Sequence, residues 1–191
     1  MFPNHDLRFC SYEAWRGVSS YTNQYTKSGF TFESWDNGVR FAFIPISDSL
    51  VYWYGTRNTS ENLKESQIFK EQLINSFKGF IQPVPTLIEG TKEKDISRKL
   101  IYDFKPLQNW SKGRVVLIGD AAHATTPNLG LGACMAVEDA EVLAKCLEQG
   151  KDLFVAVKAF EESRKDRAKL IVNSSWMYGK IAQLDNGLLV W

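Results

Sequence analysis

The chain of 191 residues contains no GxGxxG turn, the glycine pattern with which a strand and a helix hold a dinucleotide pyrophosphate. It also contains no GxxxxGK[ST] loop, which argues against an ordinary nucleotide-phosphate loop. No apolar run approaches the roughly 20 residues that are needed to span a bilayer. From the sequence we therefore expect neither a signal peptide nor a membrane anchor.

Cysteine and histidine are scarce. The three cysteines, Cys10, Cys134 and Cys146, form no CxxC pair and cannot all be bridged within one chain, which favours a reducing compartment. The two histidines, His5 and His123, have no cysteine or carboxylate partner at metal-ligand spacing. We therefore expect a cytoplasmic protein without a metal site.

Neither positive nor negative charge is in excess, because the chain has 23 Lys and Arg residues and 22 Asp and Glu residues. A formal net charge of +1 gives no strong field to attract nucleic acid or an anionic membrane. The 44% hydrophobic content is enough to bury a core. The expected partner is a small molecule or another protein.

The first half of the chain, from residue 11 to residue 57, is rich in aromatic and β-branched residues and predicts an antiparallel sheet. Asn37-Gly38 lies between two such runs and is a strong hairpin signal, because both positions tolerate positive φ. Phe41 and Phe43 should then share one face of the sheet. Further strands are predicted at 50–54 and 99–104, and a helix over 61–80 that ends at the prolines Pro83 and Pro85.

The second half changes to a strand, a long loop and helices. The compact apolar run at 114–118 predicts a strand buried on both faces. A Gly-, Thr- and Pro-rich loop follows, and then the apolar spacing over 133–147 predicts a helix that Gly150 ends. Two further helices are predicted, over 152–169 and 170–183.

The loop between residues 119 and 132 contains the residues whose chemistry best suits the binding of a ligand. The carboxylate of Asp120 can accept hydrogen bonds from ribose-like or ribityl hydroxyls. Gly130 and Gly132 allow the backbone to approach a flat ring closely, and Pro127 stiffens the loop. The helix that begins near Gly132 offers unused N–H groups and a positive dipole end to negative charge. The pattern therefore predicts a cofactor at the start of this helix.

The run GRVVLIGDAAHATTPNLGLGACMAVEDAEVLA, residues 113–144, resembles the second flavin motif of the single-component FAD monooxygenases. Para-hydroxybenzoate hydroxylase, zeaxanthin epoxidase and salicylate hydroxylase typify this family. Residues 12–17, 102–110 and 174–184 are similar to the family's substrate sheet and last helix, so the resemblance covers most of the chain. It implies FAD contacts from Gly119, Asp120, Pro127, Gly130, Leu131, Gly132 and Ala133.

The resemblance further implies reduction of FAD by NAD(P)H and oxygen transfer from O₂ to an aromatic or isoprenoid small molecule. The expected fold is α+β to α/β, with a substrate-binding sheet over residues 1–110 and the carboxy-terminal part of a Rossmann-like FAD-binding domain over 111–191. This FAD-binding domain is expected to be incomplete, because the family's opening GxGxxG unit is absent and Leu131 stands where the family usually has Gln. The alternative is a non-catalytic interaction module. The expected protein partner is a separate amino-terminal FAD-binding piece or a second copy of the chain.

Several charged residues have more than one interpretation. We expect His123 to brace the loop by hydrogen bonds with Asp120 rather than to act in catalysis. Glu138 and Asp139 diverge by about 100° on a helix, so they should not form an acid/base couple. Arg16 and Arg40 each remain open, as an anchor for a substrate carboxylate or as one side of a salt bridge.

Overall fold

The computed structural model describes residues 6–24, 26–27, 29–61, 70–150 and 152–185. They form two compact units. The sheet unit contains Ser11–Ile101 together with the described residues from Ala182 onward. The helical unit contains the described residues up to Cys10 together with Tyr102–Ile181. Each unit is described by itself below.

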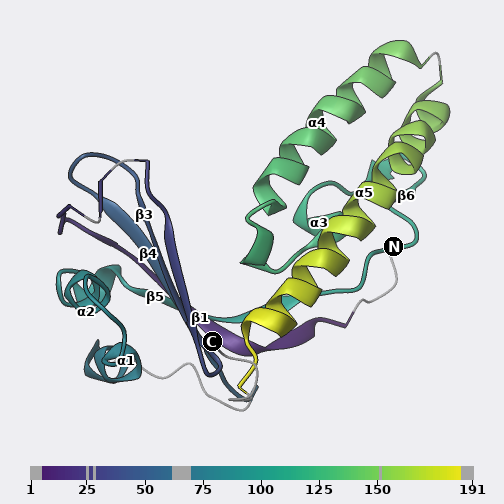
Figure 1. Ribbon diagram of the computed structural model, residues 1–191. Helices are drawn as coiled ribbons and strands as arrows, with labels where there is room; N and C mark the ends of the chain where they lie inside the picture. The colour runs from purple at the N-terminus through teal and green to yellow at the C-terminus, as the bar shows by residue number, and fades with distance from the viewer. Residues whose placement is uncertain (1–5, 25, 28, 62–69, 151, 186–191) are drawn as a thin grey trace. The chain divides into compact units, whose positions relative to one another are not determined.

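A five-stranded sheet dominates the sheet unit (Figure 1). Its spatial order is β2-β3-β4-β1-β5, and the β2–β3, β3–β4 and β4–β1 pairs are antiparallel. This confirms the predicted antiparallel sheet. The strands are β1 (Arg8–Ser19), β2 (Phe32–Asp36), β3 (Val39–Pro45), β4 (Val51–Asn58) and β5 (Ser97–Asp103).

The predicted hairpin at Asn37-Gly38 joins β2 to β3, and Asp36 pairs with Val39 at its closed end. Only Gly38 of the two turn residues has a positive φ, at 71°. Phe41 and Phe43 lie on one face of β3, as predicted, and both are buried. The hairpin therefore fixes which residues of β3 enter the core.

One face of the sheet is covered within its own unit. The core on this face contains Trp15, Phe43 and Trp53 and packs against α1 (Lys70–Phe77) and α2 (Val84–Glu89). Figure 1 shows the two helices together beside the sheet. The prediction of one helix over 61–80 is confirmed for 70–77, while 62–69 lie outside the described residues.

The helix α2 is a departure from prediction, because Pro85 belongs to its first turn instead of following a helix end. Proline is tolerated there because the first N–H groups of a helix have no intrahelical acceptor. A short 3-10 turn, η1 (Glu93–Asp95), then leads into β5.

The helical unit begins with a small hairpin, β6 (Ser111–Lys112) and β7 (Val115–Val116). The prediction of a strand buried on both faces over 114–118 is wrong. Only two of these residues are in a strand, and Val115 and Ile118 are 39% and 40% exposed. An apolar run becomes a buried strand only where other strands flank it, and among the described residues only β6 pairs with it.

The rest of this unit is helical. It contains α3 (Asp120–His123), η2 (Pro127–Leu129), α4 (Gly132–Gln149) and α5 (Leu153–Ala182). Figure 1 shows α4 and α5 side by side, and several ion pairs join them. None of the helices in the described residues is long and apolar enough to cross a membrane.

The two helices predicted over 152–169 and 170–183 are in fact the single helix α5. The charged stretch between them contains Glu, Lys and Arg, which are good helix formers, and it has neither Gly nor Pro to end a helix. Its charges are also paired: Lys165 contacts Glu161 one turn earlier, and Arg164 and Arg167 contact residues of α4. The helix therefore continues through the stretch.

Candidate functional site

The flavin-like loop runs from Gly119, which follows β7, to Gly132 at the start of α4. Gly119 precedes α3 with a φ of 56°, and a Cβ there would lie 3.2 Å from the Cβ of Ala136. Asp120 is the first residue of α3 and is exposed. No hydrogen bond or ion pair joins its carboxylate to another residue in the described ranges. The carboxylate is therefore available to a ligand.

The second part of the loop presents open backbone. Pro127 begins η2, and Gly130 ends it in the left-handed conformation with a φ of 66°. A Cβ added to Gly130 would meet nothing within 4 Å. The left-handed conformation favours glycine, and the open space beside it can accept a flat ring.

The amino terminus of α4 has no side-chain cap and no acidic residue in its first turn. Leu131 is the residue before the helix, and Gly132 and Ala133 are its first two residues. The first N–H groups of an α-helix have no acceptor within the helix, so here they face whatever lies beyond the helix end. They would favour negative charge at that position.

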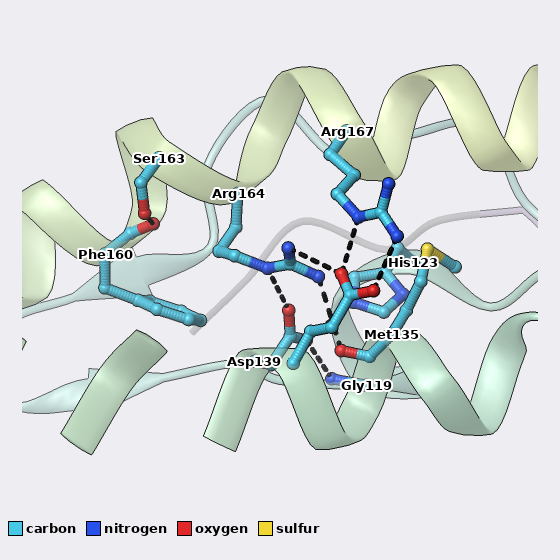
Figure 2. Close-up of polar contacts among 9 residues, drawn as sticks. Gly119, His123, Met135, Asp139, Phe160, Ser163, Arg164 and Arg167 are labelled. Atoms are coloured by element: carbon cyan, nitrogen blue, oxygen red, sulfur yellow. Dashed lines mark hydrogen bonds and ion pairs between the residues drawn. The ribbon is translucent and has the colours of Figure 1, made fainter. Parts of the chain in front are cut away.

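A buried carboxylate on α4 holds the start of the loop. Asp139 is fully buried and accepts a hydrogen bond from the Gly119 N–H at 2.8 Å (Figure 2). Its second contact from the loop is with His123 Nε2, at 2.6 Å. From α5, Arg164 donates from Nε to Asp139 Oδ1 at 2.7 Å. Two groups of the loop and one of α5 thus converge on one side chain.

The neighbouring residue Glu138 turns toward solvent and pairs with two arginines of α5. Arg167 donates two hydrogen bonds of 2.5 Å to its two carboxylate oxygens, and Arg164 Nη1 lies 2.9 Å from Oε2. The hydrogen bonds from Arg167, followed by those from Arg164, lower the pKa of Glu138 to about 2. Glu138 and Asp139 therefore form no acid/base couple, as predicted.

The expectation for His123 is wrong in one respect. His123 does brace the loop, but it contacts Asp139 and not Asp120. The reason is that His123 is buried against the Trp110 ring, 5.2 Å between centroids, whereas Asp120 lies on the exposed side of the same helical turn. His123 points into the core of the unit.

A second set of hydrogen bonds holds the middle of the loop against α5. Thr126 and Ser175 are buried with their hydroxyl oxygens 2.6 Å apart, and Ser175 Oγ also donates to the Thr126 carbonyl at 2.8 Å. Asn128 Nδ2 donates to the Ser175 carbonyl at 3.0 Å. A Cβ on Gly179 would clash with Asn128 Nδ2, so a larger residue there would displace the Asn128 amide.

Sequence reasoning missed both braces. Nothing in one sequence distinguishes Asp139 from Glu138, and Ser175 and Gly179 lie about 50 residues after the loop that they hold. The seven predicted flavin contacts, in contrast, lie within one continuous loop and helix start.

The exposed groups of the loop fit the reactive end of FAD. Asp120 has an unpaired acceptor, the kind of group that ribityl hydroxyls require, the space beside Gly130 is open, and the start of α4 has N–H donors without a side-chain cap. Thr125 Oγ1, in the same loop, is buried without a hydrogen-bond partner among the described residues. Asp120 and Thr125 thus have hydrogen-bonding groups available to a ligand, while the supporting residues Asp139 and Ser175 are hydrogen-bonded within the protein.

Comparisons with known proteins identify the family. Residues 8–175 match the family described as the FAD binding domain. The aurachin C monooxygenase/isomerase of Stigmatella aurantiaca is 39% identical over 184 residues, which are 96% of this chain and 48% of that protein. The FAD-dependent urate hydroxylase of Klebsiella pneumoniae is 30% identical over 166 residues, 86% of this chain and 43% of that protein.

Solved structures show the same relationship. Klebsiella pneumoniae HpxO, complexed with FAD and uric acid, is 28% identical with a TM-score of 0.91 over 97% of this chain and 48% of that chain. A salicylate hydroxylase substrate complex, 20% identical with a TM-score of 0.80 over 97% of this chain and 50% of that chain, shares the fold. The chain thus spans about half the length of the relatives it matches. It belongs to the family of FAD-dependent monooxygenases, whose cofactor is FAD.

Proposed function

We propose that the chain supplies the flavin-ring half of a monooxygenase that uses NAD(P)H and O₂ to hydroxylate or epoxidise an aromatic or isoprenoid small molecule. The observation that carries this proposal is the contrast within one loop. Asp120, Gly130 and the start of α4 are open, while Asp139 and Ser175 hold the loop from behind. Such a preformed set of exposed polar groups, held in place by buried hydrogen bonds, is typical of a cofactor site.

The role of each loop residue follows from its chemistry. Asp120 would accept hydrogen bonds from the ribityl hydroxyls, and the backbone from Pro127 to Ala133 would lie against the ring. The Gly119 N–H keeps the loop in place through Asp139. FAD, when bound, supplies the transfer of electrons to O₂ and of oxygen to the substrate, while the N–H groups of α4 favour negative charge on the ring.

We further propose the division of labour predicted from the sequence, with substrate binding in 1–110 and flavin binding in 111–191. Residues beyond this chain, on the same or another polypeptide, would hold the adenine end. They would cover exposed apolar residues on β7, just after it and on α4, namely Val115, Ile118, Val137 and Leu147. Without this cover we expect self-association of the chain. The three free cysteines support a cytoplasmic location.

The substrate class rests on the relatives. Proteins similar to this chain are named for urate, for 2-heptyl-3-hydroxy-4(1H)-quinolone and for zeaxanthin. Two of these names denote nitrogen heteroaromatic rings and one denotes an isoprenoid. This range supports a planar or conjugated substrate.

The test is FAD titration of the purified chain, alone and with the amino-terminal half of a relative such as the Klebsiella urate hydroxylase. We expect tight FAD binding and NAD(P)H oxidation only when both pieces are present. Tight stoichiometric FAD and full turnover by the chain alone would overturn the half-site proposal.

The second candidate function is a non-catalytic interaction module. The exposed apolar residues of α4 favour it, because such a surface also suits a protein partner. Under this interpretation, Asp120→Ala would leave partner binding unchanged, and no amino-terminal piece would restore turnover. Restoration of FAD binding that Asp120→Ala abolishes would exclude it.

A further inference from the structure

We propose that the apolar pocket between β2 and the start of α2 is a binding site for an uncharged aromatic molecule that carries a hydrogen-bond acceptor. The residues that line this pocket all lie in the sheet unit, and none belongs to the flavin loop. The inference therefore goes beyond the proposed function and does not depend on FAD binding by the chain.

The pocket lies at the edge of the sheet, on the face that α1 and α2 cover. β2 is the edge strand, and Phe32 of β2 pairs with Phe43 of β3. Residues that pair directly in an antiparallel sheet point to the same face. Phe43 belongs to the core beneath the two helices, and Phe32 packs against that core. Ile81, Gln82 and Pro83, which precede α2, complete the lining.

The pocket has the size and the lining of a small-molecule site. Its volume is about 590 Å³, within the range of about 300 to 1,000 Å³ for such sites. Phe30, Phe32 and Phe43 line it, and the rings of Phe32 and Phe43 are stacked with their centroids 5.0 Å apart. Because aromatic rings gain from contact with one another beyond the area that they bury, these walls favour an aromatic ligand over an aliphatic one.

Two large apolar side chains of the pocket are in contact with water. Phe30 and Ile81 are each 67% exposed, although both contribute to the lining. The free energy gained on burial grows with the apolar area that is removed from water. A ligand that covers these two side chains therefore gains binding energy from both.

The segment that contributes Gln24 to the pocket is held by hydrogen bonds of its own. The Asn23 N–H donates to Thr26 Oγ1 at 2.7 Å, and the Thr26 N–H donates to Asn23 Oδ1 at 3.1 Å. Thr26 is buried, so this turn is anchored in the sheet unit. A wall that is fixed before binding lowers the entropic cost of binding.

The polar groups of the pocket select the ligand's polar group. The described residues that line the pocket carry no charge, so an ion would lose its hydration there without meeting a countercharge. Gln82 Oε1 accepts a hydrogen bond from Thr86 Oγ1 at 2.8 Å, which orients the amide. The amide N–H groups of Gln82 have no acceptor among the residues that the structure describes. Gln82 would therefore donate to an oxygen of the ligand, such as that of a ketone.

The test uses 2-acetylnaphthalene as the probe, because it is uncharged and aromatic and carries one ketone oxygen. Its dissociation constant is measured with the full chain by ligand-observed NMR, and its position is followed by the chemical shifts of the Ile81 methyl groups. We expect binding that shifts these methyl signals. Phe30→Ala, which removes an aromatic wall, and Gln82→Glu, which replaces the donor by an acceptor, should each weaken binding by about threefold or more.

Two related probes test the ligand class. The anion 2-naphthoate has the same rings with a carboxylate in place of the ketone, and it should bind more weakly by about tenfold or more. The ketone with the same skeleton in saturated form should bind more weakly than 2-acetylnaphthalene, because it lacks the aromatic contacts. Equal affinity for the ketone and the carboxylate, or for the aromatic and the saturated ketone, would overturn the assigned class.

The matched controls are Phe154→Ala, at an exposed phenylalanine of α5, and Gln72→Glu, at an exposed glutamine of α1. Both should keep the wild-type affinity, and circular dichroism should show that every variant is folded. No binding by the wild type, or equal affinity of the wild type and Phe30→Ala, would overturn the inference. Binding that leaves the Ile81 methyl signals unshifted would overturn it too, because the probe would then occupy another apolar surface.

Discussion

Asp139 determines the local shape of the flavin loop, because it bonds the loop's first N–H, its buried histidine and an arginine of α5. The side chain is fully buried, as are its partners His123 and Arg164, at 1% and 4% exposure. A buried charge is tolerated when it is paired and hydrogen-bonded, and its partners become costly when it is removed. Asp139 is therefore a positioning residue, which acts on the loop through Gly119 and His123.

Asp139→Asn should destabilise the protein by about 3 kcal/mol, because it removes the fully buried anion of Arg164 and leaves only the half-buried Glu138 to pair with it. The loop start should also loosen, so that FAD affinity falls. Urea unfolding and flavin fluorescence titration measure the two effects. Asp166→Asn, at an exposed position of α5, is the control. Equal stability of both variants would contradict the account.

Glu138 makes a pH-dependent contribution to the free energy of unfolding. Its pKa is lowered from 4.5 to about 2 in the folded protein, chiefly by the Arg167 hydrogen bonds. A lowered pKa means that the stabilisation is present above pH 4.5 and is lost as the pH falls toward 2. Glu138→Gln should therefore reduce stability near neutral pH and match wild type near pH 2, as followed by urea midpoints.

The control for Glu138 is Glu162→Gln, an exposed residue of α5. This variant should follow wild type at every pH. A constant difference between Glu138→Gln and wild type across the whole pH range would show that the ion pair with Arg167 is not the cause.

At the scale of elements, the loop depends on a few backbone positions. Gly130→Ala should cost about 1 kcal/mol, because a φ of 66° strains a residue with a Cβ. The main effect should be a lower FAD affinity, since the new methyl group occupies the space proposed for the ring. The control is Gly79→Ala, where a Cβ also meets nothing within 4 Å but φ is not positive. Unchanged FAD affinity of Gly130→Ala would count against the site.

Local patterns were enough to predict some elements. The Asn37-Gly38 hairpin and the loop between 119 and 132 depend on glycines with positive φ. Such glycines can be recognised from a few neighbouring residues. The exposure of the apolar run at 114–118 could not be predicted from its own residues, because burial of a strand depends on flanking strands. The continuity of α5 could not be predicted from its own sequence, because ion pairs with α4 stabilise it. The contact of His123 with Asp139 could not be predicted either, because the two residues are 16 positions apart.

At the scale of the whole molecule, the three free cysteines lie in the helical unit and report on three different environments there. Cys10 is buried, and this burial raises its thiol pKa to about 12. The thiolate is the reactive form, so Cys10 should resist alkylation at pH 8. Cys134 is exposed in the first turn of α4, beside the proposed flavin site, and should react first.

FAD should protect Cys134 from iodoacetamide in the assembled protein and leave the half-buried Cys146 unaffected. Peptide mapping by mass spectrometry measures the rate at each cysteine. Equal labelling of Cys134 with and without FAD would place the cofactor elsewhere.

We propose that residues 119–133 form the flavin-ring half of an FAD site that other residues complete. The most direct measurement is FAD binding and NAD(P)H oxidation by the chain combined with an amino-terminal FAD-binding half, with wild type compared to Asp120→Ala. We expect stoichiometric FAD binding for the wild-type assembly and its loss in Asp120→Ala. Equal FAD affinity of the two assemblies, or FAD held as tightly by the chain alone, would contradict it.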